Sequence, residues 1–120
     1  MSEHEGIRRA LRHIVMAPQT EAELQEQIGA CLTRAGIEFE REVMTATGPV
    51  DFVVGVTVIE IKIKGSSIDV IRQVTRYLDD PRFDAGIIVT TKPFIIPIID
   101  VKTPYKLKPV RVIELWRQFL

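Results

Sequence analysis

Residues 50–64 read Val50-Asp51-Phe52-Val53-Val54-Gly55-Val56-Thr57-Val58-Ile59-Glu60-Ile61-Lys62-Ile63-Lys64. β-Branched residues dominate both sides of Gly55, which predicts strands over Val50–Val54 and Val56–Lys64, either as an antiparallel hairpin or as a strand bent at the glycine. Strand side chains alternate between faces, so Glu60 and Lys62 share one face of the second strand. Its other face is apolar, with Ile59, Ile61 and Ile63. An acid and an amine therefore lie side by side.

A second carboxylate, Asp51, follows a Gly-Pro turn and begins the first strand. If the two strands pair, Asp51 and Glu60 come together. Two carboxylates can hold a hard divalent cation, and an adjacent ammonium can orient a water, which is the equipment of metal-assisted phosphodiester hydrolysis. The same alternation is also typical of an ordinary exposed sheet face, so this pattern alone leaves both interpretations open.

Three helices are predicted from capping residues and apolar spacing. The first follows Ser2 and Glu5 and ends before Pro18; the second follows Thr20 and ends near Gly36; the third follows Ser66 and ends near Asp79-Asp80-Pro81. The apolar stripes that define them contain Ile7, Ala10, Leu11, Ile14 and Val15, then Leu24, Ile28, Cys31, Leu32 and Ala35, then Val70, Ile71, Val74, Tyr77 and Leu78. Cys31 is expected to be an inert core thiol.

Further strands are expected on both sides of this region. Ile37–Met44 alternates, with Ile37, Phe39, Arg41 and Val43 on one face. Gly86–Thr90 is an apolar run that predicts a buried strand, parallel to Val56–Lys64 through a right-handed crossover. Towards the C-terminus we expect an apolar segment broken by Pro97, a loop, an edge strand and a final helical turn, over Phe94–Ile99, Asp100–Lys108, Val110–Ile113 and Glu114–Leu120 respectively.

The composition fits one α/β domain spanning residues 1–120, since the chain has 120 residues, 46% of them hydrophobic and 27% charged. Sixteen basic residues balance sixteen acidic ones, so net charge gives no support to nucleic-acid binding. Basic clusters near the two ends can be phosphate-facing patches or solvated surface: Arg8, Arg9 and Arg12, and Lys92, Lys102, Lys106, Lys108 and Arg111. With no apolar run long enough for a bilayer and no signal-peptide pattern, we expect a soluble, cytoplasmic protein without membrane contact.

Polar residues in two of the helices extend the candidate site. Stepping ~100° per residue places Glu21 within the apolar arc of the second helix, between Ile28 and Leu32. A carboxylate buried there needs a partner, such as a cation. In the third helix Gln73 and Tyr77 lie one turn apart, so their polar ends can meet, although Tyr77 can also simply pack in the core.

The order Glu21, Asp51, Glu60-Ile61-Lys62 and Gln73-x-x-x-Tyr77 resembles the PD-(D/E)XK nuclease superfamily. The Gln-x-x-x-Tyr element is similar to that of RecB-like and lambda-exonuclease-like members. The resemblance covers residues 20–90 and implies a restriction-endonuclease-like core of helix, three mostly antiparallel strands, helix and parallel strand, here with an extra N-terminal helix. One departure is Val50 directly before Asp51, with Pro49 one place earlier.

The resemblance implies a Mg²⁺- or Mn²⁺-dependent deoxyribonuclease acting in repair, recombination or phage DNA processing. Asp51, Glu60 and the carbonyl of Ile61 would hold the metal, with Glu21 direct or through water; Gln25 is an alternative for the helical position. Lys62 would position the attacking water, and Gln73 and Tyr77 would steady the helix or contact DNA. The expected partners are DNA and a second copy or a larger DNA-processing assembly. The alternative is a non-catalytic DNA-binding or protein-interaction subunit with the same fold.

Overall fold

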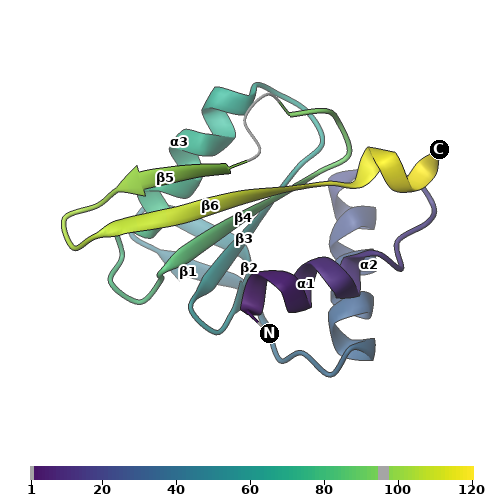
Figure 1. The fold of residues 1–120 in the computed structure, drawn as a ribbon, viewed down its shortest axis with the longest axis horizontal. Coiled ribbons are helices and arrows are strands. Elements are labelled where there is room, and N and C mark those ends of the chain that lie inside the picture. The colour runs from purple at the N-terminus through teal and green to yellow at the C-terminus, as the bar shows by residue number, and fades with distance from the viewer. Residues whose placement is uncertain (1, 95–97) are drawn as a thin grey trace.

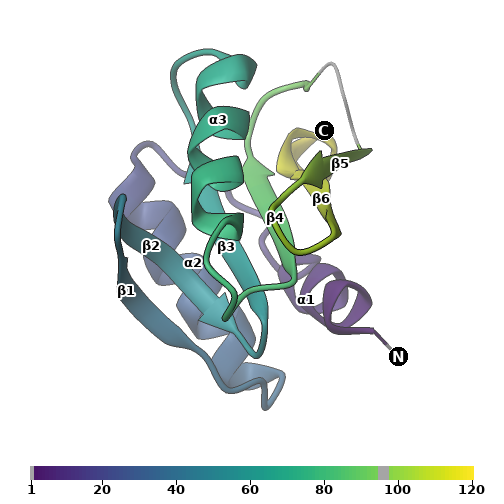
Figure 2. The ribbon, with the colours of Figure 1, turned by 90° about the vertical axis from the view of Figure 1, so that its left-hand side faces the viewer.

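The computed structural model of the chain describes residues 2–94 and 98–120. It is an α/β fold in which one mixed sheet of six strands lies between helices (Figure 1). Helices α1 (Glu3–Leu11) and α2 (Glu21–Arg34) cover one face, and α3 (Ser67–Leu78) covers the other. We call these faces the α2 side and the α3 side. The view turned by 90° shows α3 on one side of the strands and α1 and α2 on the other (Figure 2).

The three predicted helices are confirmed, and each begins where the sequence places a cap. The side-chain oxygens of Ser2, Thr20 and Ser66 accept hydrogen bonds from backbone N–H groups three residues later, at 3.1, 3.1 and 3.2 Å. These bonds satisfy donors that the first helical turn leaves without partners. The predicted stripes are buried as expected, including Cys31, where burial raises the pKa of the thiol. Three stripe residues differ: Val15 lies beyond α1 and is 68% exposed, Ala35 just after α2 is exposed, and Ile71 is only half-buried.

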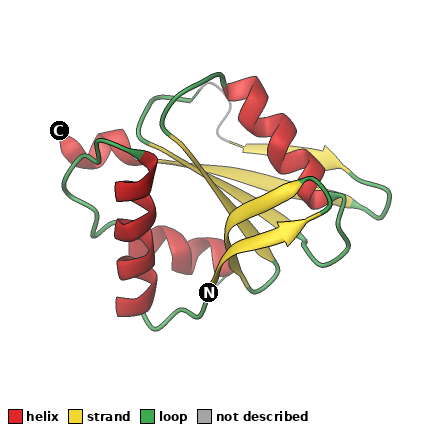
Figure 3. Ribbon diagram, turned by 180° about the vertical axis from the view of Figure 1, so that it is seen from behind, coloured by secondary structure: helices red, strands yellow, loops and turns green. Residues whose placement is uncertain are grey.

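The strand order is β1-β2-β3-β4-β6-β5. Strands β1 (Glu40–Thr45), β2 (Gly48–Val54) and β3 (Thr57–Lys62) form an antiparallel meander. Strand β4 (Ala85–Thr90) returns parallel to β3 after α3, as predicted. The observed order from α2 onwards is therefore helix, three antiparallel strands, helix and parallel strand, seen from behind in Figure 3.

The C-terminal part differs from the prediction. Strand β5 (Ile98–Lys102) lies partly where a loop was expected, and β6 (Leu107–Glu114) is longer than predicted. Strand β6 is also not an edge strand, because it pairs parallel with β4 and antiparallel with β5, which forms the edge. The final turn is the 3₁₀ helix η1 (Leu115–Phe119). Residues 95–97, including the predicted break at Pro97, lie outside the described residues.

The prediction for one face of the first strand was wrong. Glu42 has a φ of 52°, a left-handed conformation that breaks the two-residue alternation of β1. As a result, Phe39 packs and Arg41 lies over the Phe52 ring on the α2 side, whereas Val43 packs on the α3 side. Alternation read from sequence assumes a regular pleat, and a single left-handed residue inverts it.

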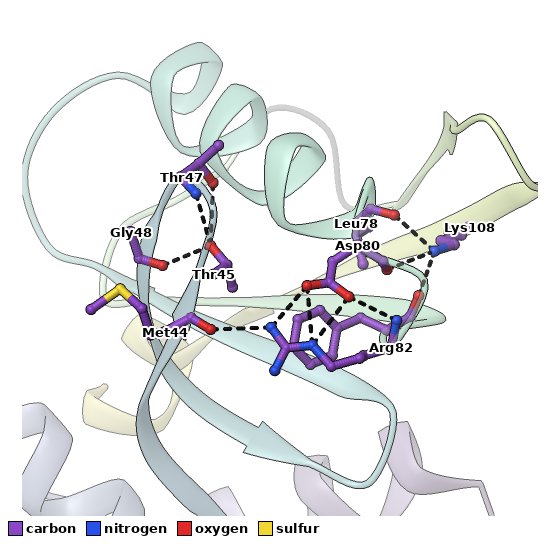
Figure 4. A network of polar contacts seen from close by, with 9 residues as sticks. Met44, Thr45, Thr47, Gly48, Leu78, Asp80, Arg82 and Lys108 are labelled. Carbon is purple, nitrogen blue, oxygen red and sulfur yellow. Dashed lines mark hydrogen bonds and ion pairs between the residues drawn. The ribbon is translucent and has the colours of Figure 1, made fainter.

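Lys108 is a core residue rather than part of a basic surface patch. It is 1% exposed, and its ammonium donates to the carbonyl oxygens of Leu78, Asp80 and Phe83, where α3 ends and the chain turns into β4 (Figure 4). Carbonyls at a helix C-terminus lack intrahelical partners, and a cation is favoured there. The segment after α3 is thereby fixed to β6.

Within residues 2–94 and 98–120, no helix combines the length and the apolar character that a membrane crossing needs.

Candidate functional site

The centre of the candidate site is the point where β2 separates from β3. The two strands pair from Val54–Thr57 to Phe52–Ile59. One residue further on, Asp51 uses its side chain instead, and its Oδ2 accepts a 2.8 Å hydrogen bond from the backbone N–H of Ile61. The Asp51 carboxylate thus lies between β2 and β3 just beyond the last paired residues, Phe52 and Ile59.

Strand β2 also changes face at Asp51. Val50 packs with the core on the α3 side and Phe52 with the core on the α2 side, although residues two apart in a regular strand share a face. The switch lies opposite the left-handed Glu42 of β1, between the paired residues 41–52 and 43–50. At this irregular position a side chain is accessible to groups from both helical layers, which explains the contacts described below.

Glu60 points to the α3 side and is 4% exposed. The Tyr77 hydroxyl lies 3.2 Å from Glu60 Oε2 and 2.9 Å from the carbonyl oxygen of Pro49, and Gln73 Nε2 donates to Tyr77 Oη at 2.8 Å. The polar ends of Gln73 and Tyr77 therefore meet, and they meet at Glu60. Tyr77 is nevertheless 1% exposed, so its ring packs in the core while its hydroxyl belongs to the site.

A buried acid, Glu60, is held close to a second, half-buried acid, Asp51. Burial, and then the neighbouring Asp51 carboxyl, raise the pKa of Glu60 to about 9, while the hydrogen bond from Tyr77 acts in the opposite direction. Burial and the adjacent Glu60 raise the pKa of Tyr77 to about 12. A buried carboxyl beside another acid either keeps a proton or requires a cation. The Glu60 environment therefore suits a bound cation.

From α2 the residue that reaches this centre is Gln25. Its Nε2 donates to Asp51 Oδ1 at 3.2 Å, so each Asp51 oxygen accepts one hydrogen bond. Glu21 is exposed, and no hydrogen bond of the described residues joins it to Asp51 or Glu60. The prediction that Glu21 is buried was wrong, because a helical projection omits position along the axis and cannot show whether anything covers the first turn.

Lys62 is the last residue of β3, next to the site in sequence. Its side chain, however, lies against Gly65 in the turn that follows β3. A Cβ built at Gly65 would meet Lys62 Cε at 2.8 Å and Nζ at 3.0 Å, so the ammonium packs on this glycine, whose φ is 95°. The ion pairs recorded among the described residues do not include Lys62. The structure therefore brings together Asp51, Glu60, Gln73 and Tyr77, with Lys62 adjacent but unengaged.

Among residues 2–94 and 98–120, no group of three or more His, Cys, Asp or Glu side chains could enclose a metal ion. Two carboxylates and the carbonyl of Ile61 are what this site offers. Mg²⁺ commonly binds through one or two carboxylates and keeps several waters, so hard oxygen ligands of this number fit it. Together with the raised pKa of Glu60, the ligand chemistry fits a hydrated hard cation better than an enclosed one.

Two well-formed cavities lie elsewhere. One of about 480 Å³ lies between the start of α1 and the first residues of β3 and β4, and one of about 360 Å³ lies between α1 and α2. Neither is lined by Asp51, Glu60, Lys62 or Tyr77. Neither of these two cavities therefore marks the position of the paired acids.

Two contacts of the site were not anticipated from sequence. The Pro49 carbonyl accepts from Tyr77, and Arg41 Nη2 donates to Gln25 Oε1 at 3.3 Å. A main-chain acceptor has no sequence signature. The Arg41 contact depends on the left-handed Glu42 beside it, which the sequence pattern does not reveal.

A scan against protein-family models, a search of curated proteins and a search of solved structures each found no match to this chain. The conclusions about function therefore depend on the geometry described above.

Proposed function

We propose that the protein is a divalent-metal-dependent nuclease that hydrolyses DNA phosphodiester bonds, with a restriction-endonuclease-like core. The observation that carries this proposal is the meeting of Asp51 and Glu60 where β2 and β3 separate, with the pKa of Glu60 raised by burial and by Asp51. The order of elements from α2 to β4 supports it, because it is the order expected of that core.

In this proposal Asp51, Glu60 and the Ile61 carbonyl hold Mg²⁺ or Mn²⁺. When bound, the cation supplies charge neutralisation at the scissile phosphate and a more acidic water. Gln73 and Tyr77 hold the Glu60 carboxyl in place from the α3 side, and Gln25 and the Ile61 N–H hold Asp51. Glu21 is left without a direct role.

Lys62 orients the attacking water in this proposal, which requires its ammonium to leave Gly65. A four-carbon side chain that is only half-buried can make this change by rotation about its own bonds. The absence of the site residues from the two cavities is compatible with a polymeric substrate, since a nucleic-acid backbone can lie along an open surface.

The decisive test is cleavage of labelled single-stranded, duplex and branched DNA with Mg²⁺, Mn²⁺ or a chelator. We expect metal-dependent cleavage by wild type and a loss of ~100-fold or more in Asp51→Asn, Glu60→Gln and Lys62→Ala, the size seen when groups that stabilise transition-state charge are removed. Asp80→Asn is the control, because this carboxylate belongs to a separate polar network that follows the C-terminal end of α3, where it pairs with Arg82 (Figure 4). Equal cleavage by all variants, or none in any condition, would contradict the proposal.

A second candidate function is a non-catalytic subunit that binds DNA or a protein through the same fold. Two observations favour it: Lys62 is packed on Gly65 rather than on the acids, and the chain has no net charge. Binding of the same DNA substrates without cleavage, unchanged by Lys62→Ala, would support this alternative.

A further inference from the structure

Arg41 of β1 is connected to the candidate site through a chain of hydrogen bonds. Its Nη2 donates to Gln25 Oε1 at 3.3 Å, Gln25 Nε2 donates to Asp51 Oδ1 at 3.2 Å, and Asp51 Oδ2 accepts from the Ile61 N–H at 2.8 Å. This series of hydrogen bonds begins at the exposed Arg41 on β1 and ends at the backbone of β3. It crosses α2 and β2 on the way.

The guanidinium is held in place by contacts outside this chain. It lies over the Phe52 ring, 5.4 Å from the centroid, and its Nη1 forms a 3.1 Å ion pair with Glu26, one residue after Gln25. A planar, forked group can satisfy these contacts at once, which a lysine ammonium cannot. The left-handed Glu42 directs Arg41 to the α2 side, so a local departure from strand geometry makes the whole arrangement possible.

The consequence concerns the orientation of the Gln25 amide. An amide has an acceptor end and a donor end, and the Asp51 carboxylate, which only accepts, is matched by the donor end. Because the Arg41 guanidinium only donates, it takes the oxygen of Gln25 and leaves the NH₂ group for Asp51. With the amide reversed, Gln25 Oε1 would face Asp51 Oδ1, and both contacts would be repulsive.

We infer that Arg41 is a positioning residue, which fixes the Gln25 amide so that the Asp51 carboxylate is held in one orientation by a donor on each oxygen. This inference rests on the proposed function in one respect only, namely that the orientation serves a metal ion. Arg41 itself touches neither carboxylate, and it acts through Gln25. Both Asp51 oxygens keep lone pairs for a cation, because each has accepted a single hydrogen bond.

The first experiment uses the metal-free protein and reads the Gln25 side-chain amide by NMR, assigned by its loss in Gln25→Ala. In wild type we expect a slowly exchanging NH₂ group. Arg41→Met retains an apolar stem over Phe52. In this variant we expect the Gln25 NH₂ hydrogens to exchange with solvent about tenfold faster, the equivalent of one lost hydrogen bond. Unchanged exchange and unchanged chemical shifts in Arg41→Met would overturn the inference, whether or not the protein binds metal.

Arg82→Met is the matched control. Like Arg41, Arg82 lies over a phenylalanine ring, 4.9 Å from the Phe83 centroid, and pairs with an acid, Asp80, at 2.8 Å. It lies just after the C-terminal end of α3, where it also donates to the Met44 carbonyl (Figure 4). The Gln25 signal should not change in this variant. Glu26→Gln removes the charge of the Arg41 partner but keeps an acceptor, and the signal should not change there either.

The second experiment measures Mn²⁺ affinity by electron paramagnetic resonance. Residues that orient metal ligands typically contribute 10–100-fold to affinity, so we expect Arg41→Met and Gln25→Ala each to weaken binding by about tenfold. The double variant should be no weaker than Gln25→Ala, because Arg41 acts through that side chain. Additive losses, or an equal loss in Arg82→Met, would overturn the inference. If wild type binds no Mn²⁺, the proposed metal site fails, and the amide experiment alone decides the role of Arg41.

Discussion

In the metal-free folded protein, Glu60 keeps its proton at neutral pH, whereas an exposed glutamate releases it. Its pKa is about 9 in the folded protein against a usual 4.5, chiefly because of burial and then because of Asp51. Between these values the folded state holds more protons than the unfolded state, so the free energy of unfolding falls as pH rises. This contribution to stability is fully present below about pH 4.5, declines as pH rises, and is lost by about pH 9.

We therefore expect Glu60→Gln to be more stable than wild type at pH 8, by several kcal/mol, and to differ little at pH 4. The amide resembles the protonated acid in shape and cannot ionise. Urea unfolding of metal-free protein at several pH values measures this. Glu26→Gln, a change at a carboxylate that is 76% exposed, should keep the wild-type pH dependence. If the free energy of unfolding varies with pH in the same way in wild type and Glu60→Gln, Glu60 is not the group that causes the pH dependence.

Other site residues show how much a sequence reveals about single side chains. The meeting of Gln73 and Tyr77 was predicted correctly, because both lie on one helix at a fixed spacing. Which of Glu21 and Gln25 contacts Asp51 was left open by the sequence, because it depends on which turn of α2 lies opposite Asp51, a relation between distant segments. Spacing within one element can be read locally, and the register between elements cannot.

At the scale of elements, the end of α3 depends on one buried cation. Lys108 donates to three carbonyl oxygens that follow the helix. Lys108→Met keeps a similar stem but leaves these acceptors buried, and we expect a loss of about 3 kcal/mol in the free energy of unfolding. Lys106→Met is the control: that ammonium pairs with Asp84, but its side chain is 57% exposed, and its loss should change stability by less than ~0.5 kcal/mol.

The packing of α3 on β4 depends on a glycine. A Cβ at Gly86 would lie 2.7 Å from Val74 Cγ1, which is closer than real side chains approach. We expect Gly86→Ala to destabilise the fold by about 1–3 kcal/mol through overpacking. Thermal unfolding of both single variants and of Gly86→Ala/Val74→Ala tests this cause. The double variant should lose less stability than the sum of the two single losses, and strict additivity would exclude the contact with Val74 as the cause.

At the scale of the whole molecule, the candidate site is where the two helical layers meet through the sheet. Gln25 approaches Asp51 from the α2 side, while Tyr77 approaches Glu60 from the α3 side. This is possible only because β2 and β3 separate and β2 changes face at Asp51. A ligand bound between the two acids would therefore be coupled to the packing of both layers.

Under the proposed function, Mn²⁺ should stabilise the whole fold. A ligand at 100 times its Kd adds about 2.7 kcal/mol to the free energy of unfolding. For a chain of this length that corresponds to a rise of several degrees in Tm. The rise should be larger at pH 8 than at pH 6, because the cation replaces the Glu60 proton. Calorimetry of wild type and Asp51→Asn tests this, and equal shifts in both proteins would place the bound metal elsewhere.

The sequence by itself determined the helices with their caps, the central strands, their order along the chain and the candidate residues Asp51, Glu60, Gln73 and Tyr77. These features are local, because periodicity, capping and spacing operate within one element or across one turn. The tertiary structure decided that Gln25 rather than Glu21 reaches Asp51, that Arg41 lies behind it, that β6 is an inner strand and that Lys108 is buried. Each of these depends on how distant segments align and on one left-handed residue, Glu42, and no local pattern encodes either.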